Sequence, residues 1–159
     1  MKKVNLFLII FMMLVLSGCG KNLNFTKTNT IKFHNLTLEI PAVFKTDNEN
    51  NDENIIFYTY DDNDKNYCML DISVSYYTKS DLKAIIREEL LDKDFVFSEK
   101  DINGYKWSIG YIEEDVKHNQ TVYAINNDNK EYLISYDDLG SGEDCSKLLK
   151  IIEKELKFN

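Results

Sequence analysis

The chain has 159 residues, 43% of them hydrophobic and 29% charged, which is enough for one domain built around a single core. Its formal net charge is −8, the same sign as the phosphate backbone of nucleic acids. The net charge therefore argues against a nucleic-acid partner.

The N-terminus has the pattern of an export signal. Lys2 and Lys3 precede an uncharged apolar run of eleven residues, Leu6–Leu16. At about 1.5 Å per residue the run covers roughly half of a bilayer core, so it is too short for a spanning helix. Small residues follow it at Ser17 and Gly18, as expected before a cleavage site.

The stretch Leu16-Ser17-Gly18-Cys19 resembles the lipobox of bacterial lipoproteins, which is cut before its cysteine. The resemblance implies that residues 1–18 are removed and that Cys19 carries a diacylglyceryl thioether. Each buried CH₂ of an acyl chain contributes about 0.8 kcal/mol, so two or more chains hold a small domain on a membrane. The resemblance thus predicts a lipoprotein that contacts the bilayer through Cys19 on the extracytoplasmic face. The alternative is an uncleaved anchor with an incidental cysteine.

Cleavage before Cys19 would remove two lysines and no acid, which changes the net charge from −8 to −10. Residues 19–30 are polar, rich in Asn and Thr, and are expected to form a tether. Residues 31–159 are then one globular domain. An acidic domain is repelled by an anionic surface, so the net charge predicts a domain held off the membrane.

The first half of the domain reads as strands. Leu36, Leu38 and Ile40 alternate with polar residues, and His34-Asn35 is expected to turn residues 31–33 back onto them. Pro41 ends that strand. Further strands are expected at residues 55–60 and 67–77, the second with Cys68, Leu70, Ile72, Val74 and Tyr76 on one face.

Two helices and four more strands follow. Leu82, Ile85, Ile86 and Leu90 have helical spacing after a start at Thr78–Asp81, where Thr78 and Asp81 have capping-box-like spacing. Asn103-Gly104 predicts a hairpin, and a second hairpin joins residues 121–125 to 131–136. After Gly140-Ser141-Gly142, a helix is expected to run to the C-terminus with an apolar stripe formed by Cys145, Leu148, Leu149, Ile152 and Leu156.

This order predicts a single α+β domain with an antiparallel sheet of about six to eight strands and two amphipathic helices packed on it. In this order, and in its segments "IKFHNLTLEIPAVF" (31–44) and "INGYKW" (102–107), the chain resembles small lipoproteins of the PsbP-like fold. The resemblance implies a layered sandwich and a binding or assembly role without a cofactor. Whether the helices cover one sheet face or both stays open.

The remaining cysteines, Cys68 and Cys145, are both expected to point into the core, because each shares a face with apolar residues. An extracytoplasmic compartment permits a disulfide between them, worth roughly 4 kcal/mol in the chain-entropy model. The alternative is two buried thiols whose Cα atoms lie more than about 7 Å apart.

Other candidate sites are weak. His34 and His118 fall in a turn and a polar loop, so neither fits a catalytic triad, and no Cys/His cluster fits zinc. Asp62, Asp64 and Asn66 have the opening rhythm of a calcium loop but lack its glycine and closing Glu. The Gly140–Gly142 segment at a helix start is interpreted as a break and cap rather than an anion site. No catalytic or metal residue is therefore predicted.

Most of the ten tyrosines, and Trp107, lie in predicted strands. They could form an exposed aromatic face that binds a ligand, but we favour the interpretation that they are ordinary half-buried strand residues.

Two function classes remain. The first is a non-catalytic binding or accessory module of the cell envelope, with an immunity lipoprotein that sequesters a cationic peptide as a special case. The second is a hydrolase with a carboxylate pair in the acidic loops.

Overall fold

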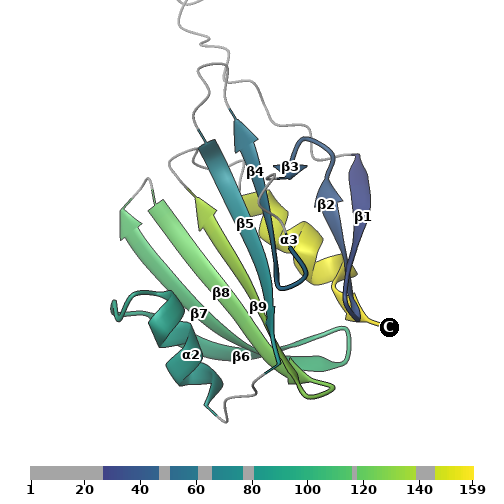
Figure 1. Ribbon diagram of the computed structural model, residues 1–159. Helices are drawn as coiled ribbons and strands as arrows, with labels where there is room; N and C mark the ends of the chain where they lie inside the picture. The colour runs from purple at the N-terminus through teal and green to yellow at the C-terminus, as the bar shows by residue number, and fades with distance from the viewer. Residues whose placement is uncertain (1–26, 47–50, 61–65, 77–80, 116–117, 139–145) are drawn as a thin grey trace, which may run out of the picture.

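The computed structural model describes residues 27–46, 51–60, 66–76, 81–115, 118–138 and 146–159. Strands dominate these segments, and two helices interrupt them (Figure 1). In chain order the elements are β1 (Thr28–Phe33), β2 (Leu36–Pro41), β3 (Lys45–Thr46), β4 (Asn54–Tyr60), β5 (Asn66–Ser75), α2 (Leu82–Glu89), β6 (Val96–Ile102), β7 (Tyr105–Asp115), β8 (His118–Asn127), β9 (Lys130–Asp138), α3 (Ser146–Glu155) and β10 (Lys157–Phe158).

The strands form two antiparallel sheets. The larger has seven strands in the order β3-β4-β5-β9-β8-β7-β6, and the smaller has three in the order β1-β2-β10. The predicted α+β domain and its two amphipathic helices are confirmed, and the large sheet is within the predicted size. The first hairpin, β1–β2, belongs to the smaller sheet. The third strand of that sheet is β10, whose residues 157–158 were expected in the final helix but pair with β2 instead.

The helices lie on opposite faces of the large sheet, which resolves the open question about their placement. The larger apolar cluster contains Leu148, Ile152 and Leu156 of α3 together with the inner faces of the small sheet and of β5 and β9. A second cluster joins Ile86 and Leu90 of α2 to the other face of β7 and β8. In β8, consecutive side chains enter different clusters, as the alternation of a strand requires.

Both hairpins of the meander occur where the sequence predicted them. Asn103 and Gly104 have φ values of 53° and 85°, the left-handed pair that a two-residue hairpin turn requires. Asp128 and Asn129, with φ values of 49° and 59°, join β8 to β9 in the same way. Asn and Asp accept this conformation because their short polar side chains bond locally.

The ends of several elements differ from the expectations. Asp81 caps α2 by accepting hydrogen bonds from the N–H groups of Lys83 and Ala84, while Thr78, the expected partner of the capping box, lies outside the described residues. The final helix ends at Glu155, because residues 157–158 form β10. Strand β1 begins at Thr28, three residues before the predicted start of the domain. Within the described part of the chain, no helix is long and apolar enough to cross a membrane.

Candidate functional site

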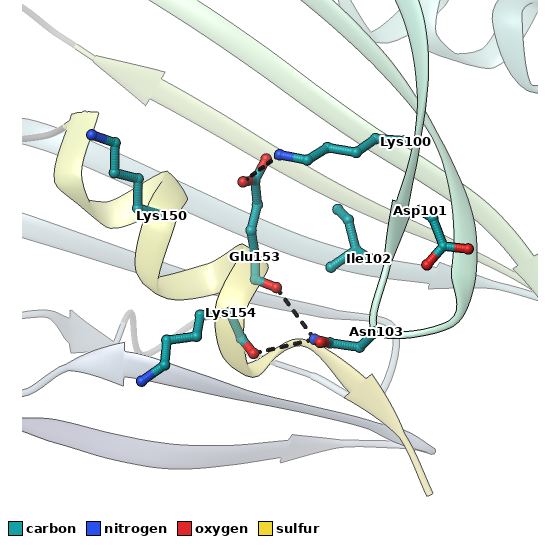
Figure 2. A pocket seen from close by; sticks show the side chains of 7 residues that line it. All are labelled: Lys100, Asp101, Ile102, Asn103, Lys150, Glu153 and Lys154. Carbon is teal, nitrogen blue, oxygen red and sulfur yellow. Dashed lines mark hydrogen bonds and ion pairs between the residues drawn. The ribbon is translucent and has the colours of Figure 1, made fainter.

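A concave site lies between α3 and the tip of the β6–β7 hairpin. It has a volume of about 320 Å³, and most of its lining is charged (Figure 2). The lining residues are Lys100, Asp101, Ile102, Asn103, Lys150, Glu153 and Lys154. This site is called the α3 pocket below.

Glu153 is the fixed centre of the α3 pocket. Its Oε2 lies 2.6 Å from Nζ of Lys100, so the carboxylate connects α3 to β6 (Figure 2). Its Oε1 accepts a hydrogen bond of 3.1 Å from the hydroxyl of Tyr123, a fully buried residue of β8. Burial, and then the neighbouring negative charge of Glu153, raise the pKa of Tyr123, so this hydroxyl stays a donor.

Asn103 fixes the hairpin tip against the end of the helix. Its Nδ2 donates to the carbonyl oxygens of Glu153, Lys154 and Leu156, at 3.2, 3.2 and 2.7 Å. These carbonyls belong to the last turn of α3 and the residue after it, where partners within the helix are lacking. The turn residue therefore also caps a helix that lies about fifty positions later in the sequence.

The lysines of the α3 pocket come from two elements. Lys150 and Lys154 lie one turn apart on the exposed side of α3, and Lys154 also contacts Glu155 at 3.0 Å. Asp101 points away from the helix (Figure 2), and its Oδ1 accepts from the Gly104 N–H. Lys150 and Lys154 point away from Lys100 and Asn103 (Figure 2), and the ammonium group next to the Glu153 carboxylate is that of Lys100, which pairs with it.

A second carboxylate site lies on the α2 side of the large sheet. Oδ2 of Asp71 accepts a hydrogen bond from Asn54, while its Oδ1 is buried without a hydrogen-bond partner. Burial raises the pKa of Asp71, and the charge of Glu89 from α2 raises it further. Glu89 is held by the hydroxyl of Ser135 at 2.6 Å. Asp71 and Glu89 thus lie in the large sheet and α2, whereas the carboxylate pair predicted from the sequence was expected in the acidic loops.

The structure gives His34 a defined environment. It lies in the β1–β2 turn with φ 53°, and its Nε2 faces the carbonyl oxygen of Asp52 at 2.5 Å. That nitrogen must carry the hydrogen, so Nδ1 accepts from Nζ of Lys130 at 3.4 Å. The ring also packs edge-on against Tyr76. His34 is thus an exposed turn residue with partners, and His118 begins β8 instead of lying in a loop.

Cys68 is fully buried beside Leu70 and Ile72, as the strand alternation predicted, and it is disulfide-bonded. Cys145 and Cys19 lie outside the described residues, as do Asp62, Asp64 and the Gly140–Gly142 segment. Pairing of Cys68 with Cys145 therefore stays a prediction. No group of three or more metal-ligating side chains occurs within the described segments.

The aromatic residues mostly support the packing interpretation. Trp107, Tyr123, Tyr132 and Tyr136 are all buried to 98% or more, and Trp107 stacks on Phe158 of β10 with centroids 5.9 Å apart. Of the tyrosines whose side chains are described, Tyr76 is the large exposed one, at 54%. Tyr76 was expected on the core face of its strand, but β5 ends one residue earlier.

Sequence comparison reveals no match to a family model or to a curated protein. The fold, by contrast, matches solved structures. One is cyanobacterial PsbP (CyanoP) from Synechocystis sp. PCC 6803, with a TM-score of 0.54 and 12% identity over 91% of this chain and 99% of that one. Another is a crystallised protein of Bacteroides thetaiotaomicron VPI-5482, with a TM-score of 0.53 and 17% identity over 86% of this chain.

The chain spans about half (49%) of the Bacteroides protein but nearly the whole of CyanoP. At these identities the likeness concerns the fold alone. Two antiparallel sheets, one helix packed between them and one on the far face make this chain a single α+β domain with the PsbP-like fold.

Proposed function

We propose that the protein is a lipid-anchored lipoprotein on the extracytoplasmic face of a bacterial membrane, where its domain serves as a non-catalytic binding or accessory module. The observation that carries this proposal is the stretch Leu16-Ser17-Gly18-Cys19 directly behind a short apolar run with a basic start. An export signal of this length followed by a cysteine is what lipid attachment requires.

The position of the first strand supports an anchored domain. Strand β1 begins at Thr28, nine residues after Cys19. Nine residues span at most about 30 Å when fully extended, so the folded domain would remain close to the lipid surface. A tether of this length keeps the domain near the membrane surface irrespective of the partner that the domain binds.

A cationic protein or peptide is the partner that the charge distribution favours. Residues 42–145 contain 24 acidic and ten basic residues, far more acidic than the rest of the mature chain. Such a surface attracts cationic partners and speeds their association at low salt. An immunity-type lipoprotein that sequesters a cationic peptide is therefore the second candidate, because the same acidic region would serve it.

Replacing Cys19 tests the anchor. We expect Cys19→Ser to abolish incorporation of radiolabelled palmitate and to release the exported domain from the membrane fraction, since the serine hydroxyl cannot form the thioether. Thr26→Ser, a conservative change in the tether that leaves all three cysteines intact, is the control and keeps the label. Equal labelling and membrane association of Cys19→Ser and the natural chain would refute the proposal.

The binding role is tested separately with peptides of equal length and opposite charge, on the full anchored chain in neutral vesicles. Capture of the cationic peptide should be at least tenfold stronger at low salt and should weaken as salt rises, because screening shortens the electrostatic range to about 10 Å at 0.1 M. Capture that ignores peptide charge would count against an acidic binding surface.

A further inference from the structure

The charges of the protein are divided between two parts of the fold. Strands β1 and β2 with the preceding Lys27 (residues 27–41) and α3 with β10 (residues 146–159) carry six basic and three acidic residues. Residues 42–145 carry ten basic and 24 acidic residues. The elements of the first group, called the terminal unit below, lie side by side and away from α2 (Figure 1). The terminal unit thus has a net charge of +3, whereas residues 42–145 have a net charge of −14.

The outer face of the small sheet contributes part of this basic side. Lys32 of β1 and Lys157 of β10 both align with Thr37 of the central strand, so two exposed lysines flank one position. Glu39 is the acidic residue of this face. It accepts a hydrogen bond from Thr30, and hydrogen bonds from Thr28 and Thr30 lower its pKa.

Helix α3 contributes the rest. Its buried stripe of Leu148, Ile152 and Leu156 faces the core, which leaves Lys150 and Lys154 on the solvent side. The α3 pocket opens beside these lysines, and its Glu153 is already neutralised by Lys100 (Figure 2). Lys150 and Lys154 extend away from Lys100 and the hairpin (Figure 2), so their exposed ammonium groups can meet phosphates outside the pocket.

We propose that the terminal unit docks on an anionic phospholipid bilayer, with Lys32, Lys150, Lys154 and Lys157 facing the phosphates. This inference rests on the proposed lipid anchor. Two observations carry it: the charge complementarity of this side, and the tether, which enters the fold at β1 within the terminal unit. The net charge alone predicts repulsion, but repulsion acts on the acidic part and turns it outward, where it can meet a cationic partner.

Lysine footprinting on the natural lipidated chain tests the docking. The protein is reconstituted in vesicles of neutral phosphatidylcholine or of an equal mixture with phosphatidylglycerol, and acetylation rates are read by mass spectrometry. We expect Lys32, Lys150, Lys154 and Lys157 to react at least threefold more slowly on the anionic vesicles at low salt, and to recover their rates at 0.5 M salt. Lys83 and Lys106, in the acidic part, should keep their rates. Equal rates on both vesicles, or protection of Lys83 and Lys106, would overturn the proposal.

Charge-reversal variants give an independent arm. Lys150→Glu/Lys154→Glu should remove the protection of Lys157, because each lysine near an anionic surface is worth roughly a fivefold change in partition. The control variant Lys83→Glu/Lys106→Glu changes the net charge by the same amount as Lys150→Glu/Lys154→Glu, and it should leave the protection of Lys157 intact. Soluble glycerol phosphate that protects as well as vesicles would show pocket binding and refute surface docking. Flotation with neutral vesicles depends on the lipid anchor and not on docking. A chain that fails to float with them lacks the anchor, whereas a chain that floats but shows no lysine protection on anionic vesicles fails to dock.

Discussion

At the scale of single residues, Asn103 has two structural roles, one in its own turn and one at the end of a distant helix. Its left-handed backbone closes the β6–β7 turn, and its amide donates to three carbonyl oxygens at the end of α3. The turn is predictable from Asn103-Gly104, because few residues accept φ above zero. The cap is not, since it requires knowing that the hairpin tip meets a helix far along the chain.

Asp71 provides a pH-dependent prediction at the same scale. Its pKa is raised first by burial and then by Glu89, so the folded state holds the proton more tightly than the unfolded state. Stability from this group is therefore present at low pH and is lost as pH rises from the ordinary aspartate pKa through the raised one. Asp71→Asn should raise the free energy of unfolding by about 1 kcal/mol at pH 7 and have little effect near pH 3.

Urea unfolding at several pH values measures this difference. Asp94→Asn is the control, because it removes the same charge from an exposed loop position. A difference between Asp71→Asn and the natural chain that stays constant from pH 3 to 7 would show that Asp71 ionisation does not oppose folding.

At the scale of elements, α2 is fixed by close contact with the large sheet. A Cβ at Gly110 of β7 would lie 2.2 Å from Cγ2 of Ile86 and 3.0 Å from Cδ1 of Leu90. Glycine is thus required there for the approach of the helix rather than for its backbone conformation. The sequence showed the apolar stripe of α2, but not which strand it would meet.

Gly110→Ala is accordingly expected to destabilise the protein by about 1–3 kcal/mol, since the branched methyl of Ile86 has little freedom to move. A double-mutant cycle with Ile86→Ala isolates the contact, because the truncation removes Cγ2. In the Ile86→Ala background the cost of Gly110→Ala should fall by more than half in urea unfolding. If the losses of unfolding free energy caused by Gly110→Ala and Ile86→Ala were strictly additive, the contact between Gly110 and Ile86 would not be the reason that glycine is required.

At the scale of the whole molecule, a disulfide at Cys68 ties β5, the third strand of the large sheet, to another part of the chain. Cys145 is the expected partner, since it directly precedes α3, whose Leu148 packs in the same cluster as Cys68.

Peptide mapping without reductant should recover a peptide linking Cys68 to Cys145. Cys145→Ser should lower the free energy of unfolding by roughly 4 kcal/mol. A link from Cys68 to Cys19 would contradict both this pairing and the lipid anchor.

The sequence by itself determined the α+β class, the faces of the strands and helices, the meander with its Asn-Gly turn, and the inward direction of Cys68. These features follow from periodicity and turn chemistry, which are local. Only the tertiary structure decided that β10 pairs with β2, that the helices take opposite faces, and that the basic termini gather on one side of an acidic protein. Each of these depends on contacts between segments far apart in the chain, which no local pattern encodes.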